Sequence, residues 1–135
     1  MPFRFLEHTA DARIECTGRD FAELLESAAA GLYAIAVRER LSDTSIERRI
    51  RVAGGNREDT LIRWLQELIF LLDTEQFVAA KFHFDAVSEQ EIDVLAGGYT
   101  CVPEERAEEV KSATYQQLSV RETEQGLLAQ VTLDL

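Results

Sequence analysis

The chain has 135 residues, and its charge balance is strongly acidic: 14 Lys and Arg face 25 Asp and Glu, for a formal charge of -11. An overall field of this sign repels phosphate backbones and anionic membrane surfaces, so direct nucleic-acid binding and membrane binding are not expected. Hydrophobic residues make up 46% and charged residues 29%, as in ordinary globular proteins. The length suits one domain with its own core, covering residues 1–135.

The beginning of the chain and its cysteines indicate a cytoplasmic protein. Met1 is not followed by a basic region and a long apolar run, and no stretch approaches the ~20 apolar residues of a membrane span. Cys16 falls on the inward phase of a predicted strand, and Cys101 falls in a stretch that is predicted to be irregular. We therefore expect two reduced thiols and no disulfide framework.

The first elements are two strands and a helix. Residues 3–5 alternate between aromatic and polar, and residues 12–17 alternate with the same period of two, so each predicts a strand, the second ending at Gly18. Asp20 precedes Glu23 by three positions, as in a capping box, and apolar residues then recur at helical spacing. This pattern predicts a helix that runs to about Val37.

The middle of the chain repeats the sequence of strand and helix. Residues 46–52 alternate and predict a third strand, which Gly54 and Gly55 turn. Asn56 then opens a second helix with a wide apolar face, in which we expect Trp64 to anchor the core. Residues 78–86 return to alternation and predict a long fourth strand.

The last third of the chain predicts three more strands, at 91–96, 111–120 and 127–135. Gly97 and Gly98 are expected to open the least regular segment, which extends to residue 109 and is either a loop or a short helical turn. The order of elements predicts an α+β fold, a single domain with two helices packed on a mostly antiparallel sheet.

The polar stretch from Glu7 to Asp11 lies between the first two predicted strands. A loop held by a sheet often carries function, although Asp and Thr in such loops are also common turn residues. Asp134 lies on the polar face of the last strand. If the first and last strands are neighbours, the carboxylates of Asp11 and Asp134 converge with backbone carbonyls, and hard divalent cations bind such oxygens. The residues alone do not exclude that Asp11 and Asp134 are ordinary surface residues without a metal ion.

Three segments resemble the signature segments of the archease family: 6–11, 110–115 and 131–134. The starts of the two helices, at Asp20 and Leu61, are also similar to that family, and the likeness covers essentially the whole chain. The resemblance implies the archease fold and a small accessory factor for the RtcB-type RNA ligase, which joins RNA ends in tRNA splicing and RNA repair. Such a factor promotes guanylylation and repeated turnover of the ligase without being an enzyme itself.

The resemblance also implies a divalent metal ion, Ca²⁺, Mg²⁺ or Mn²⁺, at the tip of the domain. Carried over by position, Asp11 and Asp134 are the carboxylate ligands, and Leu135 supplies a main-chain or terminal oxygen. Lys111 is the functional cation of the same tip. Glu7 and His8 are implied to orient the loop or to contact the partner.

The chain departs from the family pattern at two positions of the tip, and residues 99–109 lack the further His that the family often has in the loop before it. Gln116 stands where the family usually has His, and Ser112 replaces the more usual Ala. Glutamine forms hydrogen bonds but cannot take up a proton near neutral pH, so a proton-linked or imidazole-ligand role is not favoured here. Metal binding through oxygen atoms is compatible with both replacements.

Two other functions compete with ligase activation. One is a metal-independent chaperone or modulator of a tRNA-modifying enzyme such as a methyltransferase, which metal removal would leave active. The other is a free-standing metal-dependent hydrolase, which the lack of a second dense carboxylate or histidine cluster in the sequence disfavours.

Overall fold

The computed structural model describes residues 2–8 and 11–135, with the backbone alone for residues 6–8. The elements follow the chain as β1 (Phe3–His8), β2 (Asp11–Gly18), α1 (Phe21–Ala36), β3 (Ile46–Ala53), α2 (Arg57–Glu75), β4 (Phe77–Val87), β5 (Glu91–Thr100), the 3-10 helix η1 (Pro103–Glu105), β6 (Ser112–Thr123) and β7 (Gly126–Asp134).

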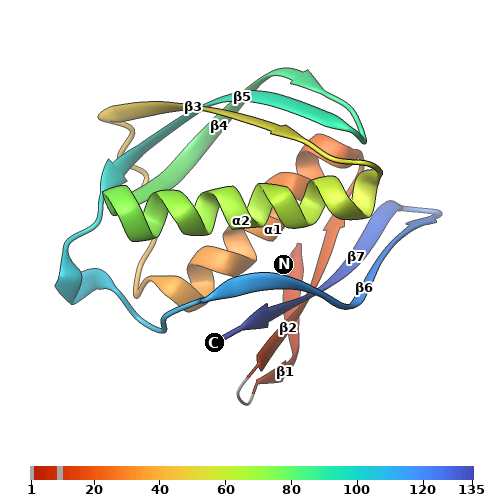
Figure 1. The fold of residues 1–135 in the computed structure, drawn as a ribbon, viewed down its shortest axis with the longest axis horizontal. Coiled ribbons are helices and arrows are strands. Elements are labelled where there is room, and N and C mark those ends of the chain that lie inside the picture. Colours follow the sequence, from red (N-terminus) through yellow and green to blue (C-terminus); the bar gives the residue numbers. More distant parts are fainter. Residues whose placement is uncertain (1, 9–10) are drawn as a thin grey trace.

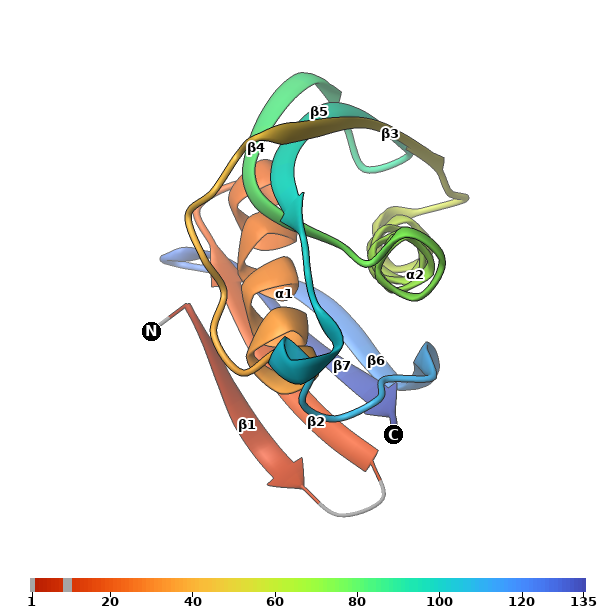
Figure 2. The same ribbon diagram turned by 90° about the vertical axis from the view of Figure 1, so that its left-hand side faces the viewer.

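The described strands form two antiparallel sheets, one in the order β1-β2-β7-β6 and the other in the order β3-β5-β4. Both helices lie between the sheets (Figures 1 and 2). The α+β class with two helices on antiparallel sheets is therefore confirmed. The division of the strands into two sheets was not predicted from the sequence, because alternation identifies strands and not their partners.

Both helices begin at the residues that the sequence indicated. The Asp20 side chain accepts a hydrogen bond from the Glu23 N–H at 2.9 Å, and the Asn56 side chain accepts one from the Asp59 N–H at 2.8 Å. These are N-cap interactions, which satisfy backbone donors that the first turn of a helix leaves free. The predicted helices are confirmed, and α1 ends one residue before Val37.

The core lies between the two sheets and includes both helices. Trp64 is fully buried, and its indole N–H donates to the Leu25 carbonyl oxygen at 2.9 Å, so the expected core anchor is confirmed. Cys16 is buried as its strand phase predicted. Cys101 lies in irregular chain, as predicted, and is buried as well, and both thiols are free. No helix in the described ranges is both long and apolar enough to cross a membrane.

Strand β5 continues through Gly97 and Gly98 to Thr100, so the prediction that these glycines open an irregular segment was wrong. A Cβ atom on Gly98 would overlap the Val78 carbonyl oxygen and lie 2.9 Å from the Phe77 ring. Glycine is required here by close approach to β4, not by a turn. Irregular chain begins only at Cys101, and η1 supplies the short helical turn that was one of the two alternatives.

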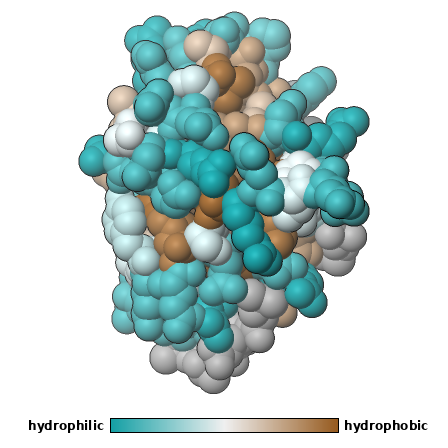
Figure 3. Space-filling model, turned by 90° about the vertical axis from the view of Figure 1, so that its right-hand side faces the viewer, coloured by the Kyte–Doolittle hydropathy of each residue, from teal (hydrophilic) through white to brown (hydrophobic). Residues whose placement is uncertain are grey.

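Arg57, at the start of α2, connects the two sheets at one end of the molecule. Its guanidinium donates to the Val120 carbonyl oxygen of β6 at 2.8 Å and lies 3.7 Å from the carboxylates of Glu89 and Glu122. Glu89 belongs to the turn between β4 and β5, so one side chain contacts both layers. Figure 3 views the molecule from this end, where hydrophilic side chains cover most of the surface and hydrophobic ones show between them.

Candidate functional site

Three strands bring polar residues into one row at the end of the four-stranded sheet. Asp11 of β2 lies directly opposite Asp134 of β7, and Ser112 of β6 lies opposite Asp134 on its other side. Figure 2 shows the C-terminal end of the chain beside the start of β2. Residues directly opposite in antiparallel strands share a face of the sheet, so the two aspartates are neighbours. The strand beside β7 is the second, β2, and not the first.

The row lies on the outer face of the sheet. Ala12 and Ile14 of β2 are buried against the helices, with 0% and 1% of their surfaces exposed, and Leu133 of β7 is likewise buried. Because strand residues alternate between faces, Asp11 and Asp134 point to the opposite side, where both are half-buried. Their carboxylates are therefore held by the sheet and remain accessible from outside.

The two carboxylates repel each other in this arrangement. Like charges directly opposite in a β-pair are destabilising. Within the described part of the chain, neither Asp11 nor Asp134 has a hydrogen bond or ion pair to its side chain that would compensate. A cation shared between the two carboxylates would replace this repulsion with attraction.

The oxygen atoms near the row suit a hard divalent cation. Besides the two carboxylates, Ser112 offers a hydroxyl, and Leu135 offers its main-chain oxygen. The Thr132 hydroxyl lies further along the same face of β7, buried and with no hydrogen-bond partner among the described residues. No group of three or more His, Cys, Asp and Glu side chains in residues 2–5 and 11–135 could hold a metal. An ion here would therefore depend on two carboxylates and on neutral oxygens.

Glu7 and His8 were predicted to lie in a loop between the first two strands. They belong to β1 instead, because this strand extends through both residues. Their backbones are opposite Arg13 and Ala12 of β2. Their side chains, together with Thr9 and Ala10, lie outside the described residues, and their roles at the tip stay predictions.

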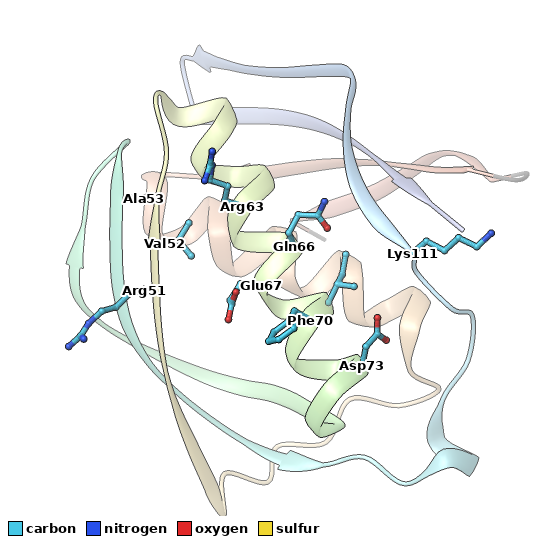
Figure 4. A pocket seen from close by; sticks show the side chains of 10 residues that line it. Arg51, Val52, Ala53, Arg63, Gln66, Glu67, Phe70, Asp73 and Lys111 are labelled. Carbon is cyan, nitrogen blue, oxygen red and sulfur yellow. The ribbon is translucent and has the colours of Figure 1, made fainter.

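Lys111 directly precedes the row and lies beside it. Its backbone N–H donates to the Asp134 carbonyl oxygen at 2.8 Å. Its side chain is exposed, extends away from α2, and lines one margin of a groove of about 580 Å³ (Figure 4). The opposite margin is formed by β3, and the floor by α2, where the half-exposed Phe70 lies.

A β-bulge interrupts β6 after Thr114, and pairing with β7 resumes only at Ser119. Gln117 has a positive φ of 55° in this bulge, and its side-chain oxygen accepts a hydrogen bond from Arg13 of β2. Gln116, the residue that replaces the family's usual His, is exposed within it. The inward phase of the strand moves from the odd-numbered Ala113 before the bulge to the even-numbered Leu118 and Val120 after it, and this change of phase was the signal in the sequence.

Tyr115 projects from the bulge to α2, where its hydroxyl donates to the Asp59 carboxylate. This hydrogen bond is the main reason that the pKa of Asp59 is lowered, with further contributions from the Gly55 N–H and Arg63. The same contact raises the pKa of Tyr115. This pair was not predicted from the sequence, because its members are 56 positions apart, with most of α2 and the strands β4 and β5 between them.

Comparison with known proteins gives a consistent result over the whole chain. Residues 3–135 match the model of the Archease protein family (MTH1598/TM1083). The protein archease of Methanosarcina mazei is 31% identical over 139 residues, which cover 98% of this chain and 95% of the relative. The protein archease of Archaeoglobus fulgidus is 36% identical over 144 residues and is covered completely, as is this chain.

Two solved structures share the fold. The solution structure of Methanobacterium thermoautotrophicum protein 1598 has a TM-score of 0.79 and 29% identity, and the match covers 99% of each chain. The crystal structure of an archease from Thermotoga maritima, described as a possible chaperone, has a TM-score of 0.71 and 22% identity, covering 96% of this chain and 94% of that one.

Proposed function

This chain belongs to the archease family, and we propose that it is a metal-binding accessory protein that activates an RtcB-type RNA ligase. In this proposal it promotes guanylylation of the ligase, and so its multiple turnover, without catalysing ligation. The observation that carries the proposal is the pair of Asp11 and Asp134, two carboxylates directly opposite each other on an accessible face.

The residues of the row have distinct roles in this proposal. Asp11 and Asp134 hold a divalent cation, and the main-chain oxygen of Leu135 is a further ligand. When bound, the ion supplies positive charge and free coordination positions for oxygen atoms of the partner. The rigid pairing of β2 with β7 keeps the two carboxylates together before the ion arrives.

Lys111 gives the same tip a positive charge. Its side chain is exposed and, within the part of the chain that the structure describes, forms no ion pair. A lysine ammonium is a compact point charge that binds phosphate or carboxylate, so Lys111 is suited to a nucleotide phosphate or an acidic group of the ligase. Glu7 and His8 complete the proposed contact. The overall charge of -11 favours a protein partner over direct contact with RNA.

The test is a ligase turnover assay at limiting ligase, with and without this protein. We expect the wild-type chain to raise the number of turnovers, and Asp11→Asn and Asp134→Asn to lose that stimulation while remaining folded. Asp43→Asn is the matched control, because Asp43 is an exposed loop residue whose side-chain oxygen accepts from the Ser45 N–H, a bond that asparagine can keep. Full stimulation by both site variants would disprove the proposal.

A second candidate is suggested by the description of the Thermotoga maritima relative as a possible chaperone. The chain would then bind and modulate a tRNA-modifying enzyme, such as a methyltransferase, through a surface that needs no metal. Chelation separates the two candidates. Activity on a partner that persists in excess chelator, and in the Asp11→Asn variant, favours the second.

A further inference from the structure

The side chain of Gln66, on α2, binds both backbone groups of one residue at the edge of β6. Its amide nitrogen donates to the Ala113 carbonyl oxygen at 3.0 Å, and its amide oxygen accepts from the Ala113 N–H at 3.2 Å. β6 is an edge strand, so these two backbone groups have no neighbouring strand to bind. The glutamine amide takes the place that a further strand would have.

This contact lies one residue from the row that carries the candidate site. Ala113 follows Ser112, which is opposite Asp134, and the preceding Lys111 donates its N–H to the Asp134 carbonyl oxygen. The Gln66 contact therefore acts on the backbone that places Lys111 and Ser112 beside Asp134.

The start of β6 is a short paired segment. Besides Gln66, it is held by the Thr114 hydroxyl, which donates to the Thr132 carbonyl oxygen at 3.1 Å, and by the Tyr115 hydroxyl at Asp59. Only residues 112–114 pair with β7 before the bulge interrupts the ladder. The chain before them, from Cys101 to Lys111, has no strand and only the short helix η1. A paired segment of this length, with irregular chain on one side and a bulge on the other, opens readily unless side chains fix it.

We propose that Gln66 is a positioning residue for the tip: by binding Ala113 it fixes Lys111 and Ser112 against Asp134. This inference rests on the proposed function, because it takes the row of Asp11, Asp134 and Ser112 as the working site. Gln66 itself need not touch the metal ion or the ligase.

The nature of position 66 supports this role. The residue is exposed and lines the groove with Lys111 (Figure 4), so its side chain is not required to fill the core. Several other polar residue types have a helix propensity similar to that of glutamine, so helix propensity alone does not select glutamine at this position. Both a donor and an acceptor are needed to bind an N–H and a C=O together, and among side chains of this length only the glutamine amide has both.

The test compares Gln66→Met, which keeps the length of the side chain and removes both hydrogen bonds, with Phe70→Met. Phe70 lies one turn further along α2, in the same groove, and its replacement leaves the charge and the Ala113 contact unchanged. Residue-resolved amide hydrogen exchange is measured for the full chain. We expect the amides of Ala113 and Lys111 to exchange about tenfold faster in Gln66→Met and at the wild-type rate in Phe70→Met.

Two further readouts connect position to function. Titration with Ca²⁺ alone, followed at the amides of Ser112 and Asp134, should show about tenfold weaker binding in Gln66→Met, and stimulation of the ligase should fall with it. Gln66→Glu keeps the acceptor for the Ala113 N–H and loses the donor, so it should lie between wild type and Gln66→Met.

The inference is overturned if the amide of Lys111 exchanges at the wild-type rate in Gln66→Met. It is also overturned if that amide exchanges faster in Gln66→Met while the Ca²⁺ affinity and the ligase stimulation of the variant equal those of the wild type. A wild-type chain that neither binds Ca²⁺ nor stimulates the ligase contradicts the proposed function instead. In that case the exchange rate at Lys111 still decides whether Gln66 holds the segment.

Discussion

Replacing Asp11 with asparagine should change the stability of the protein in opposite directions with and without a divalent cation. Asp11 and Asp134 are directly opposite, an arrangement that puts Cβ atoms about 5 Å apart. Two unit charges at about this distance repel by roughly 0.8 kcal/mol in water, and more where the surroundings are less polar. In chelator, the Asn variant should therefore be more stable than wild type by about 1 kcal/mol.

With a cation present the order should reverse. At a cation concentration about 100 times the dissociation constant, binding stabilises the wild-type chain by about 2.7 kcal/mol. If losing one carboxylate weakens binding about 100-fold, the variant gains only about 0.4 kcal/mol. The free energy of unfolding of the wild type then exceeds that of the variant by about 1.3 kcal/mol. This value is the difference between the two gains from cation binding, less the repulsion of about 1 kcal/mol that the variant no longer has.

The assay is thermal unfolding of both proteins in excess chelator and in a Ca²⁺ series. For a chain of this size we expect Tm of the wild type to rise by about 10 °C and that of the variant by about 1–2 °C. Asp43→Asn should follow the wild type throughout. An Asn variant that is less stable than wild type in chelator, or one that gains as much from Ca²⁺, would refute the assignment of these carboxylates to one ion.

Three other outcomes follow from the structure. Because the pKa of Asp59 is lowered in the folded protein, its contacts stabilise the fold at pH values above about 3.8, the pKa of an unperturbed Asp. This contribution is lost as pH falls through the lower pKa of the folded state. Denaturant unfolding should therefore show that the free energy of unfolding differs less between pH 7 and pH 2.5 for Asp59→Asn than for wild type. Gly98→Ala forces a methyl group against the Val78 carbonyl oxygen, and unfolding in urea should show a loss of about 2 kcal/mol or more. Gly55→Ala, at an exposed position where a Cβ would lie 3.9 Å from an Asp59 carboxylate oxygen, an ordinary contact, should cost little. Burial raises the pKa of Cys16 to about 12. The reaction of this thiol with a chromogenic disulfide at pH 8 should therefore be slow in the native protein and fast in denaturant. Rapid labelling of Cys16 in the native protein would contradict its burial.

The features that the sequence predicted correctly depend on residues close together in the chain. The Asp20 and Asn56 caps bind N–H groups three positions later, so a local pattern was enough to find both helix starts. The buried face of β2 was predicted from its period of two.

The features that were missed depend on distant residues. Gly98 is glycine because of Val78, on another strand, and the same residue pattern is typical of a turn. Gln66 binds Ala113, 47 positions away, and an exposed glutamine in a helix gives no signal of a backbone partner. The proximity of Asp11 and Asp134 was conditional on strand order, which the residues alone do not determine; the structure shows it through the pairing of β2 with β7.

Helix α2 has a consequence for the behaviour of the protein at high concentration. The outer margin of β6 is occupied by Gln66 at Ala113 and by Arg57 at the Val120 carbonyl oxygen. Unbound backbone groups at a sheet margin are a template on which a second molecule can add a strand and begin to aggregate. By covering these groups with the side chains of Gln66 and Arg57, the protein makes such self-association at these two positions of β6 less favourable.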